Sequence, residues 1–191
     1  MPSAAALSTR TLLVCAAIGV ATGILGGIAG VITLGVLAVT PYLYGLVLGV
    51  HVLPGIIAQE VLRRPLVALI THVIAALISS AFNPTFAMRF IGTALLFGAI
   101  QEGVAALTRY RAWGRWRFFV SAVVIGVLVA VVVGLVVDLG TFAPWVQLVY
   151  LTISVLGPVA WTGVGIAVGN ALRRAGIAPR SSHHSAGHDS R

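Results

Sequence analysis

The sequence predicts an all-α integral membrane protein, a bundle of six transmembrane helices with both termini in the cytoplasm. Of its 191 residues, 59% are hydrophobic and only 8% are charged, whereas a soluble domain carries about 25% charged residues. Six apolar runs of roughly 20 residues follow one another, and each is long enough to cross a bilayer. Arginines gather between alternate runs, as in cytoplasmic loops. This composition excludes a soluble enzyme, a disordered chain and a disulfide scaffold, and the single cysteine excludes an internal disulfide.

The apolar runs define a transmembrane domain over residues 1–174. The first run is about twice as long as the apolar core of a signal peptide, so we expect it to remain as a membrane span. Its length also predicts that it is tilted or broken near Gly26 and Gly27. The six spans are expected at about 11–39, 42–62, 65–81, 88–107, 118–137 and 145–172.

Prolines and a change of composition mark further boundaries. Pro54 predicts a kink in the second span, and Pro65 suits the first position of the third helix. The sixth span is interrupted by Gly157 and Pro158. Residues 175–191 are rich in Ser, His and Gly, which predicts a disordered cytoplasmic tail. We interpret the tail histidines as part of that segment and not as a metal site; they are His183, His184 and His188.

The arginines predict the orientation of the chain. All twelve basic residues are arginines, and with six spans only Arg89 falls on the outer side. This asymmetry places both termini in the cytoplasm of a multi-pass plasma-membrane protein. The net charge of +8 therefore reflects the positive-inside rule, and we expect no nucleic-acid partner. The eleven inner arginines are Arg10, Arg63, Arg64, Arg109, Arg111, Arg115, Arg117, Arg173, Arg174, Arg180 and Arg191.

No sequence pattern of an enzyme is present. The chain has no lysine with which to build a phosphate-binding loop and no HExxH motif. We expect no catalytic residues, no cofactor and no metal site, and therefore not an enzyme. In the first span, Ala17 and Ala21 form a small-xxx-small pair that lets another helix approach closely. Packing inside the protein is favoured over a partner surface for such pairs.

Polar residues inside spans are expensive in lipid and therefore informative. His72 and Glu102 lie at similar depth in the third and fourth spans, which predicts a buried polar pair, with Gln101 and Ser79 as further members. Two interpretations stay open: a proton-sensitive site, or a helix–helix hydrogen bond. Glu60 precedes Arg63 and Arg64 by three and four residues, which favours a local ion pair at the membrane edge.

Aromatic and polar residues gather at the predicted outer side. A belt of aromatic anchors is expected at both membrane interfaces, but a flat ligand ring can also stack on such side chains. Arg89 stands out as the lone outer arginine. The residues concerned are Tyr42, Tyr44, Asn83, Phe86, Arg89, Trp145 and Tyr150.

Two segments of the sequence carry a more specific pattern than their apolar composition. The segment RRPLVALITHVIAALISSAF at 63–82, followed by GAIQEGVAALTRYR at 98–111, resembles the YkoE-like substrate-binding (S) components of energy-coupling factor (ECF) transporters. The matching positions are Arg63, Pro65, Ala75, Ala76, Glu102 and residues 107–111. The chain length and the six predicted spans agree with the same family.

The resemblance implies an uptake protein for a vitamin or precursor, with hydroxymethylpyrimidine or thiamine as the nearest ligands. It implies a transmembrane coupling (T) subunit and two ABC-type ATPases as partners in the lipid bilayer, with Ala17 and Ala21 facing the coupling subunit. It also implies a pocket in the outer half of the bundle. The expected pocket residues are His51, Asn83, Arg89 and Trp145, with Tyr42 or Tyr44 for stacking.

The chain departs from the family pattern at three positions. His72 and Ser79 stand where acidic residues are expected, and His51 stands where a tryptophan is expected. The missing acids weaken thiamine as the ligand but leave the S-component class in place. Two alternatives are a proton-coupled carrier that uses His72 and Glu102, and a membrane protein with a structural or assembly role.

Overall fold

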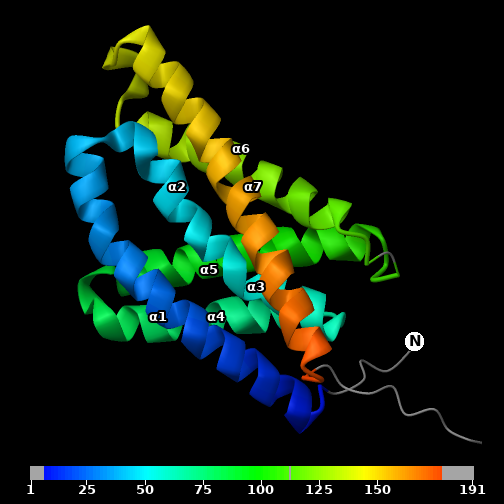
Figure 1. Cartoon of the computed structure of the whole chain (residues 1–191). Coiled ribbons are helices and arrows are strands. Elements are labelled where there is room, and N and C mark those ends of the chain that lie inside the picture. The colour runs from blue at the N-terminus through cyan, green and yellow to red at the C-terminus, as the bar shows by residue number, and fades with distance from the viewer. Residues whose placement is uncertain (1–6, 112, 178–191) are drawn as a thin grey trace, which may run out of the picture.

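In the computed structural model, which describes residues 7–111 and 113–177, the chain is helical, and that part contains no β-strand (Figure 1). Short 3₁₀ turns connect several of the helices. The tail predicted at 175–191 lies outside the described residues from 178 onward, together with its three histidines. The helices are α1 (Thr9–Val39), α2 (Tyr44–Leu48), α3 (Leu53–Leu62), α4 (Val67–Phe82), α5 (Ala87–Leu107), α6 (Trp116–Val136) and α7 (Pro144–Arg174).

Five of the six predicted spans are long and apolar enough to cross a membrane. They correspond to α1, the α2–α3 segment, α5 with its preceding turn, α6 and α7. The remaining one, α4, is apolar but has only 16 residues, about 24 Å of helix, which is shorter than a bilayer core of roughly 30 Å. The number of crossings and the side of the termini stay predictions.

The start of α4 differs from the sequence prediction. Pro65 is not the first helical residue, because the helix begins at Val67 and Leu66 adopts a left-handed conformation with φ 66°. The cause lies on another helix. The Glu102 carboxylate of α5 accepts hydrogen bonds from the backbone N–H of Leu66 (3.0 Å) and of Ala68 (2.8 Å), so a distant side chain caps α4.

The two longest helices are continuous. Of the two predicted alternatives, a tilt or a break, the break is absent: α1 passes through Gly26 and Gly27 as one helix. Gly26 allows close packing, since an added Cβ would lie 2.9 Å from Ser79 Oγ. α7 contains Pro158 within an unbroken helix, and Gly157 packs directly on the backbone of Gly45. Only the second span changes form, through a 3₁₀ segment over Gly49–Val52 just before Pro54.

The α2–α3 segment is the centre of the bundle. Its apolar window is 83% buried, whereas the corresponding windows of the other four spans are 33–44% buried, and every residue of α3 is buried. α1 packs on α4, α4 on α5, and α6 on α7, while α7 also covers α2 and α3. Figure 1 shows that α5 and α6 meet at their joining loop and diverge away from it.

Small residues of α1 serve two different faces. Gly19 and Gly23 lie against α4, where an added Cβ would approach Ile74 Cγ2 and the Ala75 carbonyl oxygen within 2.7 Å. Ala17 and Ala21, in contrast, lie on the exposed face of the helix. The glycine pair therefore packs the bundle, and the alanine pair is available to lipid or to another chain.

Candidate functional site

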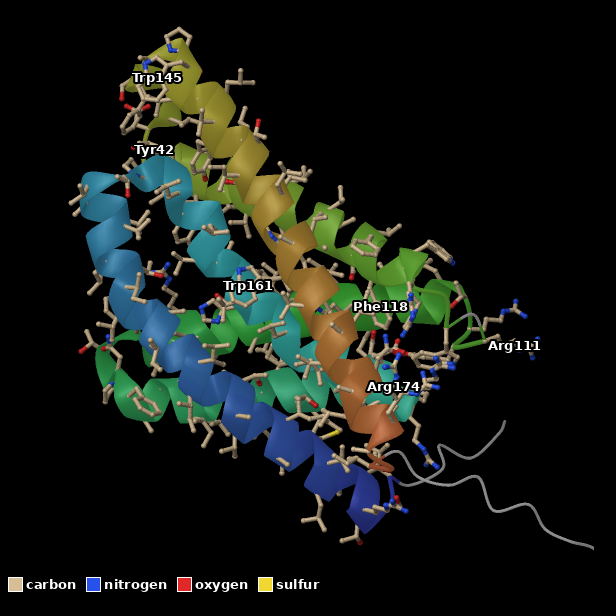
Figure 2. All side chains as sticks on the ribbon, in the orientation of Figure 1. Tyr42, Arg111, Phe118, Trp145, Trp161 and Arg174 are labelled. Carbon is tan, nitrogen blue, oxygen red and sulfur yellow. The ribbon has the colours of Figure 1, made fainter. Side chains whose placement is uncertain are left out.

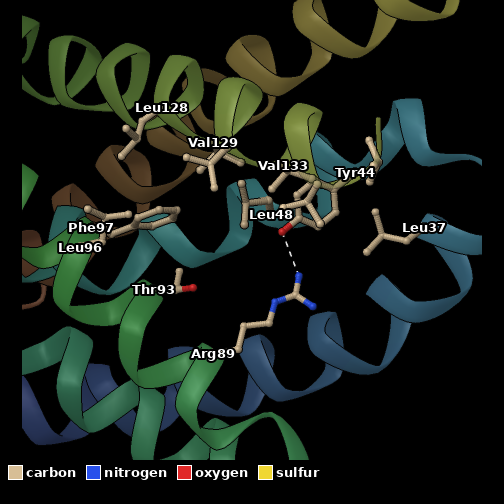
Figure 3. Close-up of a pocket in the computed structure, with 13 residues that line it drawn as sticks. Leu37, Tyr44, Leu48, Arg89, Thr93, Leu96, Phe97, Leu128, Val129 and Val133 are labelled. Atoms are coloured by element: carbon tan, nitrogen blue, oxygen red, sulfur yellow. Dashed lines mark hydrogen bonds between the residues drawn. The ribbon is translucent and has the colours of Figure 1, made fainter. Parts of the chain in front are cut away.

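A cavity of about 380 Å³ lies between α5 and α6, and residues of α1 and α2 complete its wall (Figure 3). Its size is within the range of small-molecule sites. The wall is almost entirely apolar. The polar members are Tyr44, Arg89 and Thr93; the apolar members are Leu37, Leu48, Leu96, Phe97, Leu128, Val129, Val132, Val133, Val136 and Val137.

Arg89 and Tyr44 form the polar end of this cavity. Arg89 Nη2 donates a hydrogen bond to the Tyr44 hydroxyl at 2.9 Å, and the guanidinium carbon lies 5.9 Å from the centre of the Tyr44 ring (Figure 3). Tyr44 is buried. Both ion pairs in the described part of the chain involve Glu60, so Arg89 has no acidic partner there. It also lies in the first turn of α5, where the helix dipole adds positive potential.

Two voids of about 20 Å³ each continue the cavity inward. One shares Tyr44, Arg89 and Thr93 with the main cavity and is also lined by His51. The second is lined by both His51 and His72. His51, which the sequence predicts as a pocket residue, lines both voids and not the main cavity.

His72 and Glu102 do not form the direct buried pair that the sequence predicts, because each has other hydrogen-bond partners. His72 Nε2 lies 3.1 Å from Gln101 Oε1, and the Gln101 amide donates to the Val52 carbonyl at 3.1 Å. Glu102 instead caps α4 and accepts from Gln59 Nε2 at 3.3 Å. The reason is geometric: adjacent residues of a helix point in different directions, so Gln101 faces His72 while Glu102 faces the start of α4. Gln101 and Glu102 are both buried.

Glu102 also receives a hydrogen bond from the loop that follows α5. The Tyr110 hydroxyl donates to Glu102 Oε2 at 3.1 Å. Burial, followed by the negative charge of Glu102, raises the pKa of Tyr110 to about 12. The phenol is therefore a stable donor to the carboxylate at neutral pH.

The other predicted pocket residues lie outside the cavity lining. Tyr42 and Trp145 pack together, with ring centres 6.1 Å apart, at a corner of the bundle (Figure 2). Asn83 ends α4, where its backbone N–H donates to the Ser79 carbonyl at 3.2 Å. Ser79 itself donates to the Gly23 carbonyl at 2.8 Å and so joins α4 to α1.

The expected local pair of Glu60 is only part of its environment. Arg63 lies 3.5 Å from Glu60 Oε1, as predicted, but the shorter contact, 2.9 Å, comes from Arg173 of α7. Sequence spacing could not reveal a partner 113 residues away.

Sequence reasoning missed most of the cavity wall. Thr93 lies one helical turn after Arg89, and Leu48 one turn after Tyr44, so an i, i+4 search from the two polar residues would have found both. The valines of α6 carry no such signal, because a valine facing a cavity cannot be distinguished by sequence from one facing lipid.

Comparison with known proteins identifies the fold and the family. A solved structure described as "Crystal structure of an S-component of ECF transporter" superposes with a TM-score of 0.79 at 19% identity, covering 90% of this chain and 88% of the other. No curated protein matches this chain. The family model described as "ABC-type cobalt transport system, permease component" matches residues 10–128. That match covers more than half of the chain, and the protein therefore belongs to this family of transport-system permease components.

Proposed function

We propose that this protein is the substrate-binding membrane subunit of an ATP-driven importer of the ECF type and that it binds a small vitamin or vitamin precursor. The observation that carries the proposal is the cavity between α5 and α6, apolar along its walls and closed at one end by Arg89 and Tyr44. The similarity of the fold to an S component supports it.

The cavity favours a flat organic ligand with a hydrogen-bond acceptor or a negative charge. The Arg89 guanidinium, without an acidic partner in the described chain, offers donors to that group. Phe97 and the valines of α6 provide apolar surface for a ring. A neutral hydroxymethylpyrimidine fits these features better than thiamine, because the cationic thiazolium of thiamine would meet a positive charge.

A bare cobalt ion, which the family description names, fits the cavity poorly. Transition metals in proteins are held by imidazole, thiolate or carboxylate groups. In residues 7–111 and 113–177, no cluster of three or more such side chains could hold a metal ion. Arg89 at the polar end would also repel a cation. If the family handles cobalt, this chain's cavity favours an organic molecule over the free ion.

The proposed partners are a transmembrane coupling subunit and two ABC-type ATPases. The sequence has no nucleotide-binding loop of its own, so ATP hydrolysis would occur on other chains. Ala17 and Ala21 on the exposed face of α1 are the proposed contact with the coupling subunit. The arginine-rich loops support an orientation in which the opposite end of the bundle, with Arg89, faces the outside of the plasma membrane.

The decisive experiment identifies the small molecule that leaves the gently purified protein on denaturation, using mass spectrometry. A pyrimidine or another vitamin-like organic molecule at near one per chain supports the proposal. Release of no molecule, together with no thermal stabilisation by a vitamin panel, contradicts it. Stoichiometric cobalt would contradict the organic ligand but not the importer class.

Matched variants test the location of the site. Arg89→Gln and Tyr44→Phe each remove a group at the polar end, and we expect each to weaken ligand binding by about tenfold or more, since a hydrogen bond to a charged group contributes about 1.5–3 kcal/mol. Trp145→Phe, at an exposed aromatic outside the cavity lining, is the control and should bind like the wild type. Equal losses in all three variants would contradict this location.

A further inference from the structure

A second cavity, of about 600 Å³, lies at the end of the bundle opposite to Arg89. It lies between the C-terminal ends of α3 and α7 and residues 113–115, which directly precede α6. Its charged and aromatic lining consists of Glu60, Arg63, Trp113, Arg115, Arg173 and Arg174. Figure 2 shows nitrogen atoms gathered at this corner, near Arg174 and Phe118.

The positive charge of this cavity is only partly neutralised. Glu60 is the one acidic residue in the lining, and it is shared between Arg173 at 2.9 Å and Arg63 at 3.5 Å. Arg115 and Arg174 have no ion-pair partner in the part of the chain that the structure describes. The cavity therefore carries an excess of guanidinium groups that face one space.

A buried arginine, Arg117, lies behind Trp113 and does not itself line the cavity. The side chain of Arg117 is only 1% exposed, and none of its three guanidinium nitrogens has a hydrogen-bond partner among the described residues. The guanidinium carbon lies 4.0 Å from the Trp113 ring centre and 4.5 Å from that of Phe118. Trp113 also lines the cavity. Because a buried guanidinium without a hydrogen-bond partner is costly, an anion in the adjoining cavity would stabilise it.

The position of the cavity indicates where that anion comes from. α6 begins at Trp116, which is 55% exposed, and the most apolar span of the chain follows it. Tryptophans at the end of an apolar span lie at the level of the lipid headgroups. Basic pockets between helices at this level suit anionic headgroups, and guanidinium groups bind phosphate oxygens in pairs.

We propose that the arginine cavity at the ends of α3 and α7 binds the phosphate of an anionic phospholipid. The lipid chains would lie along the exposed apolar face of the bundle, and the phosphate would neutralise Arg115 and Arg174. This site is separate from the ligand cavity at Arg89, and the inference does not depend on which vitamin the protein transports.

Native mass spectrometry of the purified protein, titrated with phosphatidylglycerol or phosphatidylcholine, tests the proposal. The test variant is Arg115→Gln with Arg174→Gln, two exposed residues whose replacement leaves the core unchanged. The control is Arg10→Gln, an exposed arginine at the start of α1 that does not line the cavity. Both variants are checked for a monodisperse, helical state before titration.

We expect the wild type to prefer phosphatidylglycerol by about tenfold or more, the double variant to lose this preference, and the Arg10 variant to keep it. Equal affinity of the wild type for the two lipids would overturn the proposal. An equal loss in the Arg10 variant would also overturn it, because the attraction would then belong to the whole face.

A further arm separates the two sources of phosphate. The wild type is heated with inorganic phosphate or with chloride at matched ionic strength, without lipid. In a separate titration, millimolar phosphate is added to the protein with phosphatidylglycerol bound, and displacement of the lipid supports a contact with the phosphate group itself. Stabilisation by inorganic phosphate, lost in the double variant and with no lipid preference, would assign the cavity to a soluble anion and overturn the lipid proposal. These readouts need no transport, so failure of the proposed importer function leaves them interpretable.

Discussion

Replacing Glu102 with alanine should destabilise the protein more than the loss of any other acidic side chain. Glu102 lies on α5, but its carboxylate organises the start of α4 through the N–H groups of Leu66 and Ala68. It also accepts from Gln59 and Tyr110. A carboxylate at a helix N-terminus satisfies orphan N–H groups and complements the helix dipole. Here both effects come from a side chain on another helix.

The magnitude follows from the groups that lose their acceptor. Alanine leaves the buried N–H of Ala68 and the amide of Gln59, which is 1% exposed, without the carboxylate. Each buried donor left unpaired costs about 1–3 kcal/mol, so for these two donors the expected loss is about 2–6 kcal/mol. For a chain of this length, that corresponds to a fall in Tm of roughly 10 °C.

The assay is thermal unfolding in detergent, followed by circular dichroism. Glu102→Gln should lose about half as much, because one oxygen can still accept a hydrogen bond. Glu60→Ala should lose only about 1 kcal/mol, because its arginine partners are partly exposed and can be solvated. Asp138→Asn, in an exposed loop, controls for the loss of one negative charge. Unfolding of Glu102→Ala no earlier than Glu60→Ala would refute the capping role.

Two further predictions concern packing and ionisation. Gly157→Ala should lower the Tm by several degrees or prevent folding, because the added Cβ would meet the Gly45 backbone. Gly163→Ala, on the same helix with open space around it, is the control and should be neutral or slightly stabilising. Similar Tm values for the two variants would show that α7 can move away from Gly45. The pKa of Tyr110, about 12 in the folded protein, predicts that stability from this phenol is intact below pH ~10 and is lost as the pH rises toward 12. The tyrosinate absorbance of the wild type minus Tyr110→Phe should show one group titrating near pH 12, and a midpoint near 10 would contradict the buried contact with Glu102.

The helices could be predicted largely from the sequence because their signal is local. A run of about 20 apolar residues identifies a span whatever it packs against, and Pro54 marked the one real change of helix form. The start of α4 could not be predicted, since it depends on Glu102, which lies 34 residues after Ala68. The sequence left open whether α1 is tilted or broken near Gly26, for a similar reason: this glycine packs against Ser79 on α4, and that contact is not visible in its sequence neighbours.

The candidate site was only partly predictable because its polar and apolar parts differ in what they reveal. Arg89 stood out as the single arginine away from the inner loops, and Tyr44 and His51 lay in the neighbouring span. The aromatic pair of Tyr42 and Trp145 has the same composition as a ligand site, yet it packs on itself outside the cavity. Residue type suggested candidates; only the three-dimensional arrangement separated them.

The polar residues of the bundle divide into two groups according to the permanence of their partners. Glu102 and Gln101 bond to backbone groups of other helices, and those partners stay in place as long as the fold exists. Arg89 differs, because its one hydrogen bond among the described residues is to the Tyr44 hydroxyl at a cavity wall, and its remaining N–H groups can donate to a ligand oxygen. Helix packing alone gives no reason to place an arginine at the mouth of an apolar cavity, and recognition of an acceptor-bearing ligand does.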